Sequence, residues 1–317
     1  MNDPKYENDL ELQAAFDDGS ATKIHEHGFV RVVDTMGDDA AIVQAARVSY
    51  GKGTKTATDD RGLIRYLMRR WHTTPFEMCE IKLHVKLPVF IARQWIRHRT
   101  ANINEISGRY SIMEDQFYVP ELSAIKPQSN ANKQGRDGEL PEQTARAMQE
   151  TLRQSGEMAF QVYGELHTGW PWADIAGDPW LDYEGRPDIP VPHDGQQGMS
   201  RELARINLPL STYTEFYWKI DLHNLFHFLR LRADPHAQQE IRDYADAICN
   251  FVSSWCPAAY EAFVDYRLEA ETFSRMEMEA LRDIISTTSF ARDKVLPFPE
   301  GMTKRESTEL AKKLGMA

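Results

Sequence analysis

The sequence predicts a globular fold that mixes β-strands with amphipathic α-helices. Some stretches alternate apolar and polar residues with the period of a strand, and others repeat apolar residues at helical spacing. Hydrophobic residues make up 42% and charged residues 27% of the 317 residues, which is an ordinary composition for a chain that buries a core. This length allows one large domain or two smaller ones.

The first half of the chain predicts two strands and three helices. A dense run of β-branched residues predicts a strand over Gly28–Met36, and because the residues before it are polar and weakly patterned, we expect the fold to begin there. Two helices should follow, over 40–50 and 59–71, each opened by a pair of aspartates that can cap it. The apolar face of the second of these helices is expected to consist of Leu63, Leu67 and Trp71.

The segment 80–87 alternates strictly and predicts a strand with one face in water. Pro88 suits the first turn of a further helix, which should run to about residue 97. The side chains expected to face inward from the strand are Ile81, Leu83, Val85 and Leu87, and those expected to face solvent are Lys82, His84 and Lys86.

The second half of the chain is less regular. A polar stretch at 129–143 and a Pro-, Gly- and Trp-rich stretch at 169–198 flank an expected helix over 141–168. The later elements should be a strand over 211–220, a helix over 221–232 with Leu222, Leu225, Phe226 and Leu229 inward, a helix over 234–252 opened by Asp234 and Pro235, and a short helix over 303–315.

Charge and cysteine content narrow the class of protein. The formal charge of -11 argues against binding to duplex nucleic acid, because affinity for that polyanion depends on lysine and arginine. The three cysteines form no metal or disulfide pattern, and no run of about 18 apolar residues predicts a membrane span. We therefore expect a cytoplasmic protein without membrane or nucleic-acid partners.

A cluster of cations interrupts this acidic chain. Arg93, Arg97, His98, Arg99 and Arg109 lie within the stretch RQWIRHRTANINEISGRYS, and arginine forks bind phosphate oxygens bidentately. Groups suited to a sugar or a base edge lie among them: Asn102, Asn104, Glu105 and Ser107. The composition fits a nucleotide site, and the alternative is a solvated basic turn that pairs with nearby carboxylates.

Histidines mark two further candidate sites. His72 opens HTTPFE and could act in a site or simply complement the dipole at a helix C-terminus. His223 and His227 share a helix face and could hold a metal with His236 or Glu240, but HNLFH lacks the glutamate of HExxH. A face that binds a polar cofactor fits this pair better, and ordinary helix-surface residues are the alternative. No GxGxxG, GxxxxGK[ST] or GxSxG motif supports a Rossmann, P-loop or hydrolase site.

The cationic stretch resembles a known signature. Arg97-His98-Arg99, seven residues and then Ser107 resemble the RHR-x7-S motif of the flavin-dependent thymidylate synthases. HTTPFE, ARQW, NEISGRYS, ARINLP and LRADPHAQ are also similar to that family, so the resemblance covers about 28–120 and 200–255.

The resemblance implies an α+β fold of the thymidylate synthase-complementing type, with a central mixed or antiparallel sheet flanked by helices. It also implies a homotetramer whose active sites are shared between subunits. On this basis we expect a polar N-terminal segment over 1–27, a single catalytic domain over 28–265 with an insertion at about 127–200, and a C-terminal helical extension over 266–317.

The activity implied is reductive methylation of dUMP to dTMP. Methylenetetrahydrofolate would supply the carbon and leave as tetrahydrofolate, FAD would carry the hydride, NADPH would reduce the flavin, and no metal is expected. Other readings are a nucleotide-binding regulator without turnover and a metal-dependent nucleotide hydrolase built on His223, His227 and His236.

The resemblance assigns roles residue by residue. The positions that match FAD contacts are Ser49, Thr74, Arg97, His98, Arg99, Glu105, Asp221, Leu222, His223 and His227. Those that match the dUMP site are Gln94, Trp95, Ile96, Arg97, Glu105, Ile106, Ser107, Gly108, Arg109, Arg205 and Arg232. Arg232 matches the residue that favours ionisation of the uracil ring, and His72 matches a histidine near the flavin and folate. The sequence departs from some relatives at Asp221 and His223, where they carry asparagine and arginine, and at Asn102, where a second serine is sometimes found.

Overall fold

The computed structural model describes residues 4–48, 59–130, 133, 135–168, 198–287 and 302–314. The chain divides into two compact units, Met1–Leu268 and Glu269–Ala317. The second unit contains α10 (Arg275–Thr287) and α12 (Lys304–Lys313). Helix α12 agrees with the short helix predicted over 303–315. Across the described residues, no helix has both the length and the apolar character needed to cross a membrane.

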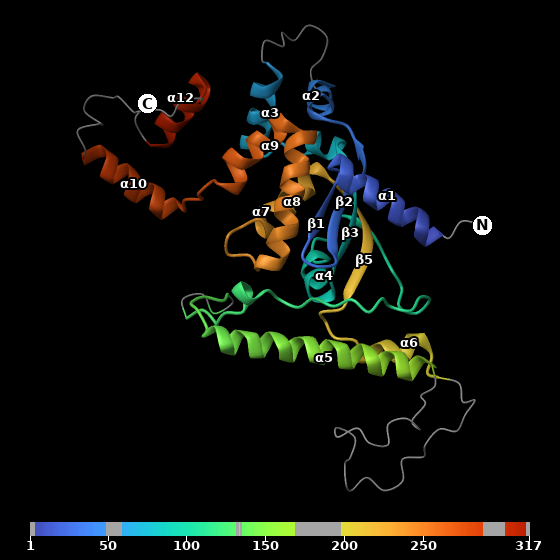
Figure 1. Ribbon diagram of the computed structural model, residues 1–317. Coiled ribbons are helices and arrows are strands. Elements are labelled where there is room, and N and C mark those ends of the chain that lie inside the picture. The colour runs from blue at the N-terminus through green and yellow to red at the C-terminus, as the bar shows by residue number, and fades with distance from the viewer. Residues whose placement is uncertain are drawn as a thin grey trace. The chain divides into compact units, whose positions relative to one another are not determined.

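The first unit is built on an antiparallel sheet of five strands in the order β1-β2-β3-β5-β4, so it is an α+β fold as expected (Figure 1). The three long strands agree with the strands predicted from the sequence. The bounds are β1 Ala21–Ile24, β2 Gly28–Met36, β3 Glu80–Pro88, β4 Asn102–Glu105 and β5 Tyr213–Asp221.

The central strand β3 has the predicted buried face, and Ile81, Leu83, Val85 and Leu87 are all at most 1% exposed. The prediction of a solvent-facing His84 is wrong. His84 is buried because the ring of Phe29 packs against it edge-on, Tyr217 stacks on it, and its Nε2 hydrogen-bonds to Glu215. Side chains of the neighbouring strands therefore cover His84, which the alternation of apolar and polar residues alone predicts to face solvent.

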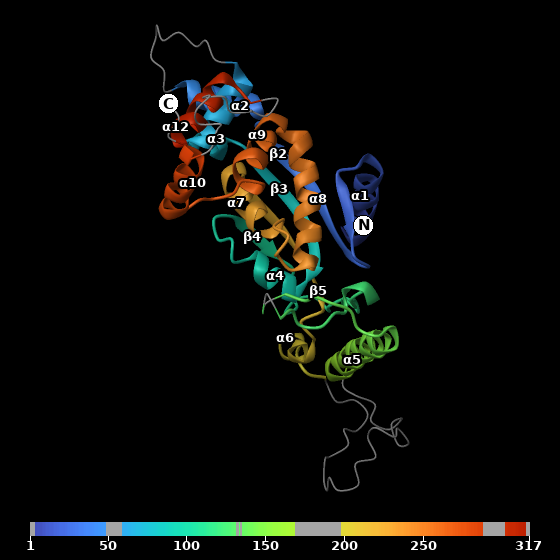
Figure 2. The same ribbon diagram turned by 90° about the vertical axis from the view of Figure 1, so that its left-hand side faces the viewer.

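Three helices, α4, α7 and α8, pack on the buried face of the sheet, and α9 follows α8 and packs against α3 at the end of the sheet (Figures 1 and 2). Their bounds are α4 Val89–Trp95, α7 Leu222–Arg232, α8 Gln239–Trp255 and α9 Pro257–Phe263. The four inward residues predicted for α7 are buried. Trp95, Trp218 and Phe228 pack with ring centroids 4.7–5.2 Å apart, which joins α4, β5 and α7 through one aromatic cluster.

Aspartates were predicted to open three helices, and the structure agrees for two of the helices and differs for the third. Asp38 accepts hydrogen bonds from two backbone amides at the start of α2 (Asp39–Val48), and Asp59 caps α3 (Asp60–Arg69). The expected start of α8 at Asp234 and Pro235 is wrong, because Asp234 instead closes a local turn with the backbone N–H of His236 at 2.7 Å.

Two elements precede Gly28, where the sequence pattern indicates the start of the fold. They are α1 (Pro4–Asp18) and β1, which adds an edge strand to β2. Phe16 packs edge-on against Phe29, and Glu11 pairs with Arg31 at 3.1 Å. The N-terminal residues therefore belong to the same packed unit as the sheet.

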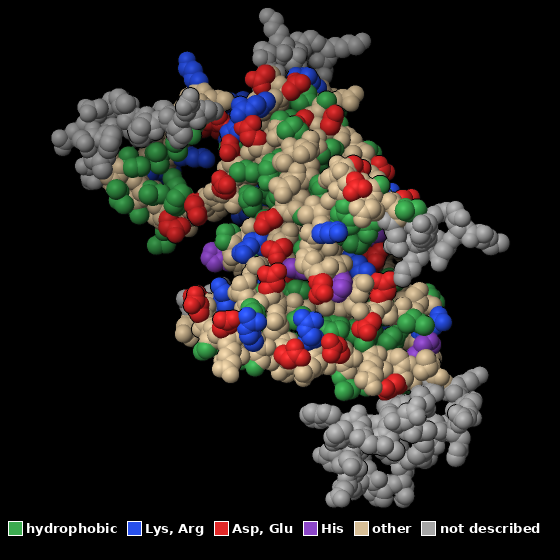
Figure 3. Space-filling model, viewed as in Figure 1, with side chains coloured by type: hydrophobic (Ala, Val, Ile, Leu, Met, Phe, Trp, Pro, Cys, Tyr) green, Lys and Arg blue, Asp and Glu red, His purple; other side chains and the backbone are tan. Residues whose placement is uncertain are grey.

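A smaller core joins the long helix α5 (Glu142–Thr168) to α6 (Arg201–Ala204), and residues 169–197 between these helices lie outside those the structure describes. Its centre consists of Phe160, Tyr163 and Ala204. The opposite face of α5 intersperses acidic and basic side chains, as Figure 3 shows. Two ion pairs along the helix, Arg146 with Glu142 and Arg153 with Glu150, fit a solvated surface. Among its described residues, the first unit also contains the short 3₁₀ helices η1 Thr74–Met78, η2 Leu122–Ala124 and η4 Arg205–Asn207.

Candidate active site

The RHR segment leaves the core at a fixed point. Helix α4 ends at Trp95, whose side chain is completely buried in the aromatic cluster, and the amide of His98 donates to the Trp95 carbonyl at 3.0 Å. Strand β4 then continues the motif by pairing with β5, where Asn102 lies opposite Lys219. The buried tryptophan and the strand pairing together hold Arg97–Arg99 between α4 and α7.

Arg232, the last residue of α7, meets this segment. Its Nε donates to His98 Nε2 at 3.1 Å, and its terminal amino group donates to the Gln94 carbonyl at 3.2 Å. Burial, with Arg232 and His227 nearby, lowers the pKa of His98 to about 4. The imidazole is therefore neutral near pH 7 and carries its proton on Nδ1, which leaves Nε2 free to accept from Arg232.

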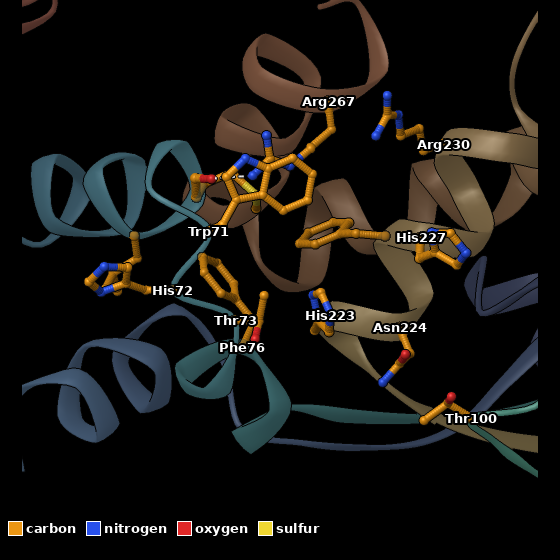
Figure 4. A pocket seen from close by; sticks show the side chains of 13 residues that line it. Trp71, His72, Thr73, Phe76, Thr100, His223, Asn224, His227, Arg230 and Arg267 are labelled. Atoms are coloured by element: carbon orange, nitrogen blue, oxygen red, sulfur yellow. Dashed lines mark hydrogen bonds between the residues drawn. The ribbon is translucent and has the colours of Figure 1, made fainter.

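Two adjoining cavities open along α7. The first, of about 320 Å³, is lined by residues that include Arg97, His98, Arg99, His227 and Arg232, and we call it the His98 cavity. The second, of about 570 Å³, is lined by His72, Thr73, His223, His227 and others, and we call it the α7 pocket (Figure 4). Thr100, Asn224 and His227 line both, so the two cavities share one wall.

The α7 pocket combines an apolar side with a polar side. Leu67, Met68, Phe76 and Phe226 are buried core residues that reach it, and His223, Asn224 and Thr100 offer hydrogen-bonding groups. Such a lining suits a flat aromatic ligand that carries polar substituents. The histidine pair predicted from the sequence lies in this lining, with His223 half-buried and His227 exposed at the wall that the two cavities share.

A helix-ending turn places His72 and Trp71 at this pocket. The amide of His72 donates to the Leu67 carbonyl at 3.0 Å and that of Trp71 to the Met68 carbonyl, the Schellman pattern that ends α3. Trp71 has a φ of 60°, a left-handed conformation that costs a side-chain-bearing residue about 1–2 kcal/mol. The prediction that Trp71 continues the apolar face of α3 is therefore wrong, and its side chain is 61% exposed.

Asp221 has a clear local role. Its side chain caps α7 by accepting from the amide of Asn224 at 2.9 Å and from the Asn224 side chain at 2.7 Å. The cap orients Asn224 toward both cavities. The sequence did not indicate a role for this asparagine, although it lies between His223 and His227, which were predicted site residues. Leu222 is fully buried, so only its backbone is available to a ligand.

The second half of the motif lies beside α6. Arg109 pairs with Glu202 at 3.0 Å, and Arg201 donates to the Tyr110 carbonyl at 2.7 Å. Gly108 is buried against Arg205, whose Cδ would lie 3.3 Å from a Cβ added at the glycine. The structure thus brings Ser107, Gly108, Arg109 and Arg205 together, and we call this group the α6 cradle.

Strand β4 separates the α6 cradle from the His98 cavity within one chain. Its register with β5 runs from Asn102 opposite Lys219 to Glu105 opposite Phe216, a span of about 10 Å. Glu105 accepts a hydrogen bond from the Thr214 hydroxyl at 2.5 Å, and Ile106 is exposed. Neither cavity is lined by a residue of the cradle.

The remaining predicted site residues fall into three groups. Gln94 donates to Gln238 at 2.6 Å, and Ile96, which follows Trp95 at the end of α4, is partly buried. Thr74 is exposed at the start of η1, and its neighbour Thr73 is the threonine that lines the α7 pocket. Ser49 lies outside the residues that the structure describes.

The donor set favours an organic cofactor over a metal. Within the described ranges, no group of three or more His, Cys, Asp or Glu side chains could hold a metal ion. His236 is exposed and pairs with Asp234 rather than with the other two histidines of the hydrolase hypothesis. By contrast, an apolar floor bordered by amide, imidazole and guanidinium groups fits a flavin with its phosphates.

Comparison with known proteins places this geometry in a family. The profile of the thymidylate synthase complementing proteins matches residues 31–258. A flavin-dependent thymidylate synthase of Rickettsia bellii (strain RML369-C) is 52% identical over 291 residues, covering 92% of this chain and 92% of the relative. One from Ruegeria pomeroyi is 50% identical over 295 residues, covering 93% of this chain and 88% of the relative.

The fold also matches a solved structure. The UMP/dUMP methylase PolB of Streptomyces cacaoi, bound with 5-Br UMP, superposes with a TM-score of 0.62 at 30% sequence identity. The match covers 98% of that chain and 78% of this one, so this chain carries segments beyond the shared fold.

Proposed function

The chain belongs to the thymidylate synthase complementing protein family, and from that premise we propose that its α7 cavities are the site of flavin-dependent synthesis of dTMP from dUMP. In the balanced reaction, dUMP, methylenetetrahydrofolate, NADPH and a proton give dTMP, tetrahydrofolate and NADP⁺. FAD, when bound and reduced by NADPH, would supply the hydride that converts the transferred one-carbon unit to a methyl group. The chain's own residues bind and orient these molecules and polarise the uracil ring.

The observation that carries the proposal is the contact between Arg232 and His98 at a cavity edge. A neutral His98 holds the guanidinium in one orientation without competing for its charge. Burial lowers the pKa of Arg232 from its ordinary value, but a guanidinium stays protonated at neutral pH. Placed beside the N3/O2 edge of uracil, this charge stabilises the negative charge that develops on the ring.

Recognition of dUMP is assigned to the α6 cradle. Arg109 and Arg205 would provide cationic forks for its phosphate, and the absence of a Cβ on Gly108 lets the Arg205 side chain pack against the backbone next to Ser107. Arg109, which pairs with Glu202 in the chain alone, would exchange that carboxylate for the phosphate. The UMP/dUMP specificity of the Streptomyces cacaoi relative supports this class of substrate.

Because the cradle and the His98 cavity are separate within one chain, we propose that the working enzyme is a homotetramer in which one subunit's cradle faces another's cavity. FAD would contact Arg97–Arg99, His223 and His227, with His72 at the flavin and folate. The protein would act in the cytoplasm, where the free thiols of Cys79, Cys249 and Cys256 stay reduced.

Anaerobic spectroscopy of the purified protein tests the function directly. Protein loaded with FAD and reduced by NADPH should reoxidise its flavin on mixing with dUMP and methylenetetrahydrofolate, and dTMP should form. Protein that cannot take up FAD, or that binds dUMP without turnover, would contradict the proposal, and the second result would favour a nucleotide-binding regulator.

A further inference from the structure

The rim of the α7 pocket carries two arginines that have no part in the proposed chemistry at the uracil ring. Arg230 extends from α7, and Arg267 extends from the π-helical turn η5 (Val264–Leu268). Figure 4 shows them on the same side of the pocket, with Arg267 above the indole of Trp71 and Arg230 beyond it along α7. Neither residue belongs to a motif recognised in the sequence.

The positive charge at this rim is not compensated within the part of the chain that the structure describes. Arg267 donates to two backbone carbonyls, those of Tyr266 and Met68, and neither it nor Arg230 pairs with a described carboxylate. Desolvation and the neighbouring Arg230 lower the pKa of Arg267 to about 10. Among the described residues that line the pocket there is no aspartate or glutamate, in a chain whose net charge is -11.

Trp71 serves as a platform for Arg267. The guanidinium carbon lies 3.3 Å from the centre of the indole, and the two carbonyl contacts fix the plane of the group. Trp71 occupies the position after α3 at which glycine is the favoured residue, and it adopts the left-handed backbone that this position requires. A strained residue that holds a charged group at a cavity points to a functional role for that group.

The rest of the pocket indicates what the rim would bind. The apolar floor suits an aromatic ring system, and the two cations at one end suit a doubly charged group attached to that ring system. FAD, which fits the same floor, carries its doubly charged pyrophosphate between its flavin and its adenosine. Two co-substrates of the proposed reaction instead carry a doubly charged group as a substituent at one end: the folate, with the two carboxylates of its glutamate, and NADPH, with its 2′-phosphate. Their shared chemistry is an aromatic body with a dianionic tail.

We propose that Arg230 and Arg267, supported by Trp71, form a subsite for the dianionic tail of a co-substrate at the rim of the α7 pocket. This inference rests on the proposed function and specifies residues that determine co-substrate affinity rather than the rate of the chemical step.

Steady-state kinetics of Arg230→Gln and Arg267→Gln in the full-length holoenzyme test the subsite. Each change should raise KM for one anionic co-substrate about tenfold, the loss expected for one charge-assisted contact, and leave kcat within about twofold. Arg267→Lys should recover part of the affinity. Trp71→Gly, which keeps both charges but removes the platform, should raise the same KM. Arg146→Gln, the same charge change on exposed α5, is the matched control and should alter neither constant.

Tail-truncated co-substrates identify which tail is bound. If the tail is the folate glutamate, methylenetetrahydropteroate, which lacks it, should show the same KM with wild type and variants. If the tail is the 2′-phosphate, the preference of wild type for NADPH over NADH should disappear in the variants. Either result supports the subsite.

Three results would overturn the subsite. They are an unchanged KM for both co-substrates, a rise only in KM for dUMP, or loss of FAD from the variants as seen in flavin absorbance. Unfolding midpoints of all variants separate a binding defect from loss of structure. Absence of dTMP formation by the wild type would instead contradict the proposed function itself.

Discussion

Arg232 is the residue on which the proposed chemistry depends most. It contacts His98 and the Gln94 carbonyl, and no acid competes for it in either of these contacts. The change Arg232→Ala should lower kcat by about 10²–10³, as removal of one group that stabilises developing negative charge does. Arg232→Lys should be intermediate, because an ammonium cannot reproduce the fork that reaches both partners.

Single-turnover measurements locate the effect of Arg232. Reduction of the flavin by NADPH should keep its wild-type rate in Arg232→Ala, and the dUMP-dependent reoxidation of reduced flavin should slow. Equal slowing of both half-reactions would indicate that the substitution disturbs the flavin site and not the uracil ring.

His98 should make the stability of the protein depend on pH in mildly acidic solution. Its pKa is lowered from 6.5 to about 4 in the fold, so the folded state favours the neutral imidazole. The stabilisation is complete above the unfolded pKa of 6.5 and is lost as pH falls toward about 4, because the unfolded chain then binds the proton more readily.

The change His98→Gln should therefore flatten this part of the pH dependence. Its amide oxygen can still accept from Arg232 but cannot titrate. Thermal unfolding at about pH 7.5 and about pH 5 should show a larger loss of Tm for wild type than for the variant. A loss of the same size in both proteins would mean that His98 is not held neutral by the fold.

At the scale of the elements, the sequence predicts those that bury one clear face. β3, β5 and α7 were predicted because their apolar residues follow the period of a strand or a helix. β4 was missed because all four of its side chains are exposed, and only its backbone pairing with β5 makes it a strand. α1 was missed because its apolar residues do not gather on one face.

The candidate site follows the same division. The RHR and SGR residues were predicted because they form a contiguous motif, whereas the contact between His98 and Arg232 joins residues 134 positions apart. That contact depends on the packing of Trp95 against Phe228, which no local pattern encodes. Asn224, Arg230 and Arg267 reach the pocket for the same reason and were not predicted.

A close contact between helix α5 and Phe117 offers a matched pair of substitutions. Gly156 is buried against the ring of Phe117, and a Cβ there would lie 2.3 Å from it, whereas a Cβ at Gly164 on the same helix meets nothing within 4 Å. Gly164→Ala should stabilise the protein by up to about 1 kcal/mol through helix propensity. Gly156→Ala should destabilise it by about 1–3 kcal/mol through overpacking.

The two variants should also differ in substrate binding. Because α5 packs against the segment that carries Arg201 and Arg205, displacement of the helix should raise KM for dUMP in Gly156→Ala only. Urea unfolding and the KM for dUMP check both effects. Equal behaviour of the two alanine variants would show that Phe117 does not hold the helix.

At the scale of the whole molecule, the α6 cradle and the His98 cavity, which we propose to be two halves of one site, do not meet within one chain. The α6 cradle and the His98 cavity are held apart by β4, whose pairing with β5 makes the separation rigid. Flexing within a subunit would have to break these backbone hydrogen bonds to close the gap. Assembly with another copy closes it without any such cost, which is the physical reason to expect shared sites.

Shared sites predict that two inactive variants restore each other. Arg205→Ala removes a cradle residue and Arg232→Ala a cavity residue, so each homotetramer should be nearly inactive. The two variants are mixed in equal amounts, dissociated and reassembled into tetramers. About a quarter of the sites should then combine an intact cradle with an intact cavity, and activity should recover toward that fraction of wild type. Each variant reassembled alone is the control. No recovery in the mixture, with tetramers verified by light scattering, would mean that both arginines serve the same subunit's site, and β4 would then have to unpair for catalysis.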